Sequence, residues 1–161
     1  MKTGSQYSGR VRLRTCGLLI QNESILLVKQ NVPTMNEPVW IPPGGGVELG
    51  ESLDETLARE VFEETRLQIS DVRLRYIHEF IQPPFHAVEF YYIVNQFNGR
   101  LKTGSDPERQ KENQDILDAL FAPYKYLSGW NVHPRFLIEE IKNQRLENHG
   151  ITRFRTVRNT T

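Results

Sequence analysis

The chain has 161 residues, a length that suits one domain with a sizeable hydrophobic core. Twenty basic and twenty acidic side chains give a formal net charge of zero, which argues against a uniformly basic coat for nucleic acid. Hydrophobic residues make up 38% and charged residues 25%, so fibrous and compositionally disordered classes are excluded. We predict a single domain over residues 1–161, with flexible tails at 1–9 and 151–161.

Signals for export or membrane insertion are not recognisable in the sequence. Residues 1–8 lack the apolar core of a secretory signal, and no run approaches the roughly 20 apolar residues of a membrane span. Cys16 is the only cysteine, so no intrachain disulfide can form, and its apolar neighbours predict a buried, reduced thiol. We therefore expect a cytoplasmic protein that does not associate with a membrane.

The first half of the chain predicts two strands, a long loop and a helix. Val11–Ile20 and Ser24–Gln30 are rich in β-branched residues and leucine, and a tight turn separates them. Residues 31–50 are rich in proline and glycine around Trp40, which predicts a long loop of the kind that is often functional. Ser52 and Glu55 have the spacing of a capping box, so we expect a helix that ends near Thr65.

A second pair of strands follows the helix. Val72–Phe80 and His86–Phe97 alternate apolar and polar residues, which indicates two strands separated by the break at Gln82–Pro84. Asn98 and Gly99 form a hairpin-turn signal, and residues 100–103 leave room only for a short edge strand.

The last third of the chain predicts one more strand and one more helix. We expect a strand at Asp115–Ala122, a short turn or helix at 123–127, and an amphipathic helix at Pro134–Asn148. Residues 151–161 carry three arginines and no acid, and we expect them to fray. The four histidines share no metal-binding spacing, so we interpret them as structural or surface residues.

The predicted helix and the turn before it are strongly acidic. Seven acids and one base, Arg59, lie between Glu48 and Glu64, and Glu60 and Glu64 are one helical turn apart with Glu63 beside them. One interpretation is a solvated helix face on which the base pairs with a neighbouring acid. The other is a set of oxygen ligands for Mg²⁺, because this hard cation takes carboxylates, waters and phosphates.

The glycines Gly44, Gly45 and Gly46 favour the second interpretation. They lie just before the helix, so their backbone can approach a phosphate or a metal without obstruction, near the positive end of the helix dipole. No Gly-Lys-Ser/Thr follows them, which excludes a P-loop. We expect these three glycines to contribute to cofactor and phosphate binding.

Residues 45–67 closely resemble the signature of the Nudix hydrolases. That signature has Gly, five residues, Glu, seven residues, Arg-Glu, an aliphatic residue, any residue, Glu-Glu, any residue, Gly and an aliphatic residue. The matching positions are Gly45, Glu51, Arg59, Glu60, Val61, Glu63, Glu64 and Leu67. Arg66 stands where the family has Gly, at the helix end; a positive φ there costs about 1 kcal/mol, and no proposed ligand is lost.

The resemblance implies an α/β fold, namely the Nudix α/β/α sandwich with a central mixed β-sheet. It implies a Mg²⁺-dependent hydrolase, in which Mn²⁺ can replace Mg²⁺, that cleaves the pyrophosphate bond of a nucleoside diphosphate derivative. By the same resemblance Glu60 and Glu64 are the main metal ligands, and Glu63 contributes directly or through water. Glu51 and Arg59 are structural, because the family pairs these positions to brace the loop against the helix.

The resemblance leaves the general base open. The family takes it from the signature helix or from a carboxylate in a later loop, where Glu108, Glu112 and Asp115 are candidates. We prefer Glu112, which precedes the next predicted strand, although an ordinary surface charge explains each of these acids equally well.

The resemblance does not decide the identity of the substrate either. Pro83 and Pro84 lie about sixteen residues beyond the signature, which is similar to the ADP-ribose pyrophosphatase subgroup, so we prefer ADP-ribose or a nucleotide sugar. A plain loop between strands explains the prolines equally well. Trp40, Phe80 and Phe85 can stack on a base, although Trp40 also suits a core anchor.

Two other functions fit the same signature: a housecleaning nucleoside triphosphate pyrophosphohydrolase, and a nucleotide-sensing module without turnover. The partners we expect are a small nucleoside diphosphate substrate, with no nucleic acid and no membrane. The family analogy is also compatible with a homodimer.

Overall fold

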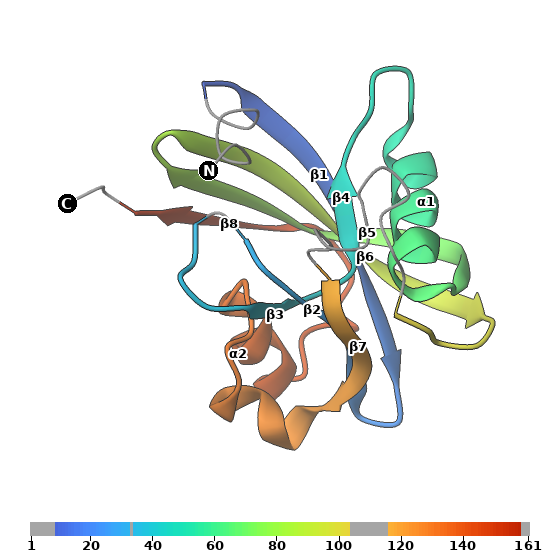
Figure 1. The fold of residues 1–161 in the computed structure, drawn as a ribbon. Helices are drawn as coiled ribbons and strands as arrows, with labels where there is room; N and C mark the ends of the chain where they lie inside the picture. The colour runs from blue at the N-terminus through green and yellow to red at the C-terminus, as the bar shows by residue number, and fades with distance from the viewer. Residues whose placement is uncertain (1–8, 33, 104–115, 159–161) are drawn as a thin grey trace.

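A mixed β-sheet divides the molecule, with α1 (Leu53–Thr65) on one face and α2 (Phe136–Lys142) on the other (Figure 1). The computed structural model describes residues 9–32, 34–103 and 116–158. The strands are β1 (Val11–Gln21), β2 (Ser24–Gln30), β3 (Val39–Ile41), β4 (Gly44–Gly46), β5 (Gln68–Gln82), β6 (Phe85–Asn98), β7 (Ile116–Pro123) and β8 (Thr152–Val157). These layers form the α/β/α sandwich expected from the sequence.

The short strand β4 lies beside the main path of the sheet. The main path is β3-β2-β1-β6-β5-β8, in which β1 and β6 are parallel, β5 and β6 antiparallel, and β5 and β8 parallel. β4 pairs with the first half of β1, from Arg14 opposite Gly46 to Cys16 opposite Gly44. Among the described strands β4 has no second neighbour, and its residues Gly45 and Gly46 are half-buried whereas Gly44 is buried.

Two hydrophobic clusters lie on opposite faces of the sheet, because successive side chains of a strand point to opposite sides. On β1, Cys16 and Leu18 belong to the cluster under α2, whereas Leu19 belongs to the cluster under α1. On β6, Tyr91 and Tyr92 divide in the same way. Cys16 is a buried, free thiol, as expected, and burial raises its pKa to about 12.

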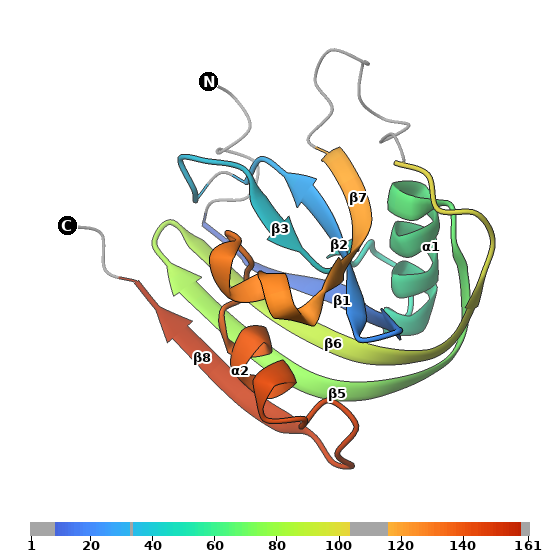
Figure 2. The same cartoon turned by 90° about the horizontal axis from the view of Figure 1, so that it is seen from below.

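The central hairpin is longer than the alternation of polar and apolar residues predicts. β5 has 15 residues and β6 has 14, and the pair curves across the molecule from β8 towards α1 (Figure 2). Pro83 and Pro84 form the turn between them, at the predicted break. The expected edge strand at residues 100–103 is wrong, because this segment pairs with no strand.

The predicted loop at residues 31–50 contains two three-residue strands. β3 pairs with β2, and β4 pairs with β1. Three residues are too few to show a period of two, and glycine has a low intrinsic preference for strands, so β4 gave no strand signal. The segment Gly44–Gly46 is therefore a strand rather than a loop.

The second predicted helix is also shorter in the structure. α2 ends at Lys142, and Gln144 takes a φ of 55°, which no helix continues through. Within the described ranges no helix has both the length and the apolar character needed to cross a membrane.

The expectation of a frayed tail at residues 151–161 is wrong for Thr152–Val157. These residues form β8, which pairs in parallel with β5 from Tyr76 to Ile81. Phe154 points inward and stacks on Phe136 of α2, with ring centroids 4.2 Å apart. The arginines of β8 lie on its exposed face, which is why the segment reads as a polar tail.

Phe154→Ala tests whether β8 is an integral part of the sheet. Loss of a partly buried ring from the stack with Phe136 is expected to lower the free energy of unfolding by about 1–3 kcal/mol. The measurement is chemical denaturation, with the exposed Arg153→Ala as the matched control. Equal stability of the two variants would mean that the strand contributes nothing.

Candidate active site

The start of α1 is held by reciprocal hydrogen bonds. Ser52 Oγ accepts from the N–H of Glu55 at 3.2 Å, and the Glu55 carboxylate accepts from the N–H of Ser52 at 2.8 Å. These bonds hold the pKa of Glu55 below its ordinary value. The capping box is confirmed, and it sets the rotation of the helix so that Leu57 and Val61 are buried against the sheet.

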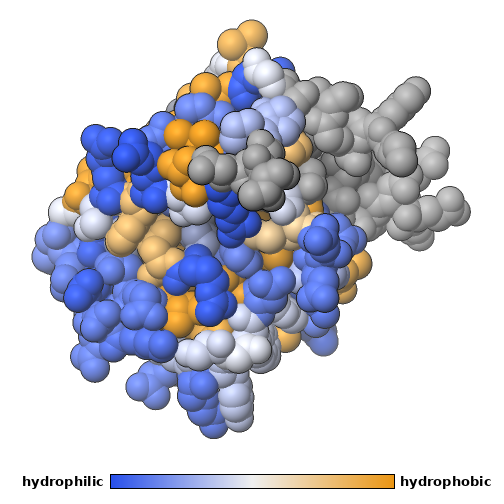
Figure 3. All heavy atoms as spheres, turned by 90° about the vertical axis from the view of Figure 1, so that its left-hand side faces the viewer, coloured by the Kyte–Doolittle hydropathy of each residue, from blue (hydrophilic) through white to orange (hydrophobic). Residues whose placement is uncertain are grey.

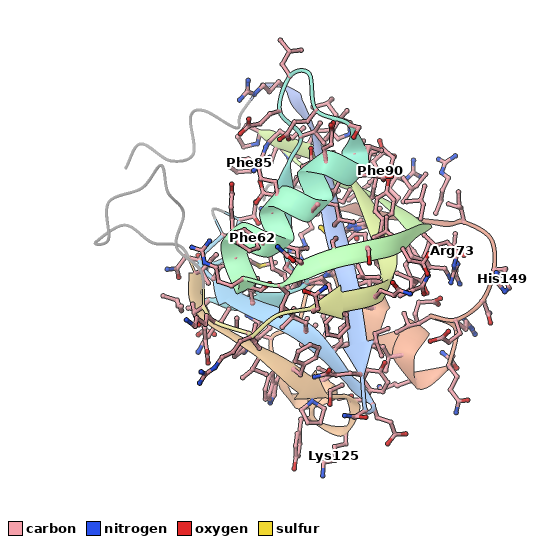
Figure 4. All side chains as sticks on the ribbon, turned by 90° about the vertical axis from the view of Figure 1, so that its right-hand side faces the viewer. Phe62, Arg73, Phe85, Phe90, Lys125 and His149 are labelled. Atoms are coloured by element: carbon pink, nitrogen blue, oxygen red, sulfur yellow. The ribbon has the colours of Figure 1, made fainter. Side chains whose placement is uncertain are left out.

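The end of α1 keeps its turn despite the change from the signature. Arg66 takes a φ of 63°, the left-handed conformation that glycine adopts most easily, and its N–H donates to the carbonyl of Phe62 at 2.9 Å. Phe62 lies on the face of α1 shown in Figure 4, and the Arg66 guanidinium lies 5.5 Å from its ring centroid. This cation–π contact offsets part of the cost of the positive φ.

Arg59 gathers the carboxylates of the turn and the helix. Its Nε and Nη2 donate to the two oxygens of Glu51 at 2.7 and 2.9 Å, and its Nη1 donates to Glu60 at 2.8 Å and to Glu63 at 3.4 Å. Its Nη2 also donates to the carbonyl of Gly46 at 3.3 Å. One guanidinium thus connects the end of β4, the following turn and the middle of the helix.

The bond from Arg59, together with one from Thr56 Oγ1 at 2.8 Å, lowers the pKa of Glu51 to about 2. Glu51 is therefore ionised at every pH at which the protein is expected to work. Its two oxygens accept three side-chain hydrogen bonds in all, which fixes the turn against the helix.

The other carboxylates lie directly against the glycines of β4. The N–H of Gly44 donates to Glu64 Oε2 at 2.9 Å. A Cβ on Gly45 would overlap the Glu60 carboxylate, and one on Gly44 would overlap the carbonyl oxygen of Thr15. Only glycines let this strand fit between β1 and the acidic face of the helix.

Burial makes this group of acids electrostatically unfavourable when no cation is bound. Desolvation raises the pKa of Glu60, and desolvation together with the charge of Glu60 raises the pKa of Glu64 to about 8. Glu64 is 8% exposed and has a backbone N–H as its hydrogen-bond partner. A bound divalent cation would supply the positive charge that balances these carboxylates.

The donor set fits a hard cation, although the side chains are turned to other partners. Among the described residues no three acidic, histidine or cysteine side chains converge closely enough to hold a metal ion. Arg59 engages Glu60 and Glu63, and Gly44 engages Glu64. Carboxylates from neighbouring turns of one helix, beside an accessible strand backbone, nevertheless match the oxygen chemistry that Mg²⁺ requires.

The structure brings together most of the residues singled out in the sequence. Glu64 contacts Gly44 and Glu60 lies against Gly45 at one edge of the sheet, and Arg59 joins Glu63 to Glu60 and to the carbonyl of Gly46. Glu112, and with it Glu108 and Asp115, lies outside the described residues. The ring of Trp40 lies 5.1 Å from that of Trp130, which favours a core anchor over a stacking platform.

A cavity of about 210 Å³ on the α2 face of the sheet was not predicted. Its polar floor is built on Glu89, which accepts from Arg14 at 3.1 Å and from Tyr91 at 3.1 Å and lies 2.8 Å from Nδ1 of His78. Phe80, one of the predicted stacking residues, also lines it. The sequence signal was the presence of charged residues inside apolar strands, but their assembly depends on pairing between distant strands.

Glu64→Gln tests the electrostatics of the site without metal. The folded protein retains the Glu64 proton up to about pH 8, whereas the unfolded chain loses it near 4.5. The stability of the metal-free protein should therefore fall as pH rises from 4.5 to 8, and the variant should lose this dependence. Thermal unfolding in chelator at pH 5.5 and pH 8 measures it, with Glu63→Gln as the control. If the difference in melting temperature between the unmodified protein and Glu64→Gln is the same at both pH values, this account is contradicted.

Comparison with known proteins agrees with this geometry. The family model described as the NUDIX domain matches residues 11–136. The ADP-ribose pyrophosphatase of Methanocaldococcus jannaschii is 32% identical over 95 residues, which cover 56% of this chain and 54% of that protein. The NAD-capped RNA hydrolase NudC of Pectobacterium carotovorum is 32% identical over 92 residues, which cover 57% of this chain and 33% of that protein.

The chain thus spans about half the length of the first relative and a third of the second. The solved structure of the MutT protein from Methanosarcina mazei superimposes with a TM-score of 0.67 over 85% of this chain and 96% of that one. At 18% sequence identity this likeness concerns the fold. Because the family model matches most of the chain and the signature residues meet at one place in the structure, this chain belongs to the Nudix family.

Proposed function

We propose that the chain is a Mg²⁺-dependent pyrophosphohydrolase that cleaves a nucleoside diphosphate derivative. The observation that carries the proposal is the contact between the buried carboxylates of α1 and the glycine backbone of β4. It combines groups that can hold a cation, Glu60 and Glu64, with the glycine backbone of an edge strand, beside which we place the diphosphate. The family match and the pyrophosphatase relative support the same chemistry.

A diphosphate repels an incoming water because its oxygens are negatively charged. Bound Mg²⁺ supplies the opposite charge, lowering this repulsion and stabilising the departing phosphate. In the proposed site Glu60 and Glu64 hold the cation, Glu63 contributes directly or through water, and a backbone carbonyl at Gly44 or Gly45 adds a further oxygen. Mn²⁺ suits the same ligands.

The remaining residues of the signature keep this geometry in place. Arg59 and Glu51 tie the turn after β4 to the helix and so orient Glu60 towards the strand. We propose that Glu112 is the general base that takes a proton from the attacking water. The single-domain organisation, a cytoplasmic location and a homodimer also remain predictions.

Within this reaction class we propose ADP-ribose or a nucleotide sugar as the substrate. The Methanocaldococcus jannaschii relative, an ADP-ribose pyrophosphatase, supports this choice. Cleavage of a nucleoside triphosphate is the alternative, and it differs in releasing pyrophosphate rather than two monophosphates. A nucleotide sensor without turnover is the third candidate, and the complete set of signature carboxylates argues against it.

A panel of nucleoside diphosphate derivatives and triphosphates, incubated with Mg²⁺ and analysed for monophosphate and pyrophosphate, tests the activity. Glu60→Gln and Glu64→Gln are each expected to lower kcat by at least about 100-fold, because each removes a charged ligand while preserving side-chain shape. Glu139→Gln, the same change on the exposed side of α2, is the matched control.

Wild-type turnover in either site variant would exclude the proposed ligands. A folded protein that turns over no member of the panel would exclude a pyrophosphohydrolase. If it still bound nucleotide, and Glu64→Gln bound equally well, the sensor would be the better account.

A further inference from the structure

The cavity on the α2 face is much more basic than acidic. Three arginines and two histidines line it, whereas Glu89 is the only acid among the described lining residues; the basic residues are Arg14, His78, His133, Arg135 and Arg158. Its volume of about 210 Å³ lies below the range of roughly 300–1,000 Å³ typical of pockets for whole small molecules. It therefore suits one moiety of a larger ligand.

Glu89, the one acid among the described lining residues, is already paired with a base. Glu89 pairs with Arg14 at 3.1 Å, lies 2.8 Å from His78 and accepts from the Tyr91 hydroxyl at 3.1 Å. His78 is held from its other nitrogen by Thr156 Oγ1 at 3.0 Å. This buried network forms the floor of the cavity, and among the described lining residues it leaves no unpaired negative charge for the two other arginines.

Arg135 and Arg158 pair with no carboxylate in the described part of the chain. Arg135 Nη1 donates to the carbonyl of Trp130 at 3.2 Å. The Arg158 guanidinium lies 5.7 Å from the Phe80 ring centroid, and its backbone N–H donates to the carbonyl of Ile81 at 2.8 Å. Arg158 Nη1 also donates to Met35 Sδ at 3.6 Å. None of these contacts is with a carboxylate, so both positive charges are available to a ligand.

The two arginines also lie close to His133. Burial and the positive charges of Arg158 and Arg135 together lower the pKa of His133. The end of β8 and the connection from β2 to β3 contribute to this part of the cavity. They lie on the side of the molecule shown in Figure 3, where strongly hydrophilic and apolar side chains are interspersed.

The cavity is next to the candidate active site, on the other side of two strands. Ile41 and Pro42, just before β4, line the cavity, as do Arg14 and Cys16 of β1. Arg14 is paired in register with Gly46, whose carbonyl accepts from Arg59 on the α1 side. Since β4 is an edge strand, a ligand that crosses this edge can reach both faces.

We propose that the cavity is a subsite for a substrate moiety that carries its own oxyanion, a phosphomonoester or a carboxylate, in addition to the diphosphate. Arg158 and Arg135 bind this oxyanion, and Phe80 and Phe136 provide apolar walls for the rest of the moiety. The inference rests on the proposed pyrophosphohydrolase function and narrows its substrate class. ADP-ribose and simple nucleotide sugars are then weaker substrates than their phosphorylated or acidic counterparts.

Matched substrate pairs test the subsite. One pair is ADP-ribose and its 2′-phosphorylated form, and the other is UDP-glucose and UDP-glucuronate. The protein is expected to prefer the more anionic member of at least one pair by about tenfold in kcat/KM, because each charged hydrogen bond is stronger than a neutral one. The pair that shows the preference identifies the oxyanion as phosphate or carboxylate.

Arginine variants test whether the cavity causes the preference for the more anionic substrate. Arg158→Gln and Arg135→Gln are each expected to remove most of it, with a much larger loss on the more anionic member than on its counterpart. Arg153→Gln, an exposed arginine of β8 that does not line this cavity, is the matched control and should retain the full preference. Equal losses on both members would mean that the arginines bind the diphosphate, and absence of a preference in the unmodified protein would overturn the subsite.

Binding measured in chelator separates this inference from the proposed function. Calorimetric titration with each substrate pair is expected to show tighter binding of the more anionic member, and Arg158→Gln should abolish the difference. With this result but no turnover, the subsite stands and the pyrophosphohydrolase fails. If both members of each pair are instead turned over with equal affinity and equal kcat/KM, the pyrophosphohydrolase stands and the subsite fails.

Discussion

The arrangement of the turn after β4 and of most acids of the candidate site depends on the ion pairs of Arg59. Glu51, Glu60 and Glu63 all accept hydrogen bonds from this one guanidinium, which also donates to the carbonyl of Gly46. Without it, carboxylates one turn apart on α1 would repel one another and turn outward to solvent. With it, they stay gathered beside β4 while no metal is bound. The same contact therefore serves both the stability of the turn and the readiness of the site.

A second constraint on the site is steric: the residues of β4 have little room for side chains. Gly44 and Gly45 leave no room for a side chain on either side, because Thr15 lies against one and Glu60 against the other. This close packing brings the backbone of an edge strand within hydrogen-bond distance of a buried carboxylate. Charge and shape thus act together: Arg59 holds the acids in place, and the glycines let a strand reach them.

The sequence predicted what depends on local rules. The cap at Ser52 and the cluster of acids follow from spacing along one helix, and Arg66 adopts the left-handed conformation in spite of its side chain. The strand β4 could not be predicted, because three glycines carry no strand signal. The strand β8 was hidden for a different reason, since only Phe154 makes a large apolar contact. The basic cavity needed the pairing of strands far apart in the chain, which no local pattern encodes.

The candidate active site and part of the basic cavity come from different portions of the chain. The family match ends at residue 136, whereas Thr156 and Arg158, at the end of β8 and just after it, lie beyond it. The acids and glycines of the candidate active site belong to the matched portion, while part of the wall of the basic cavity is supplied by a segment outside it. In the proposed subsite, substitutions in this terminal segment would alter which molecules are accepted while leaving Glu60, Glu64 and the glycines of β4 unchanged. Selectivity can thus diverge during evolution at little cost to chemistry.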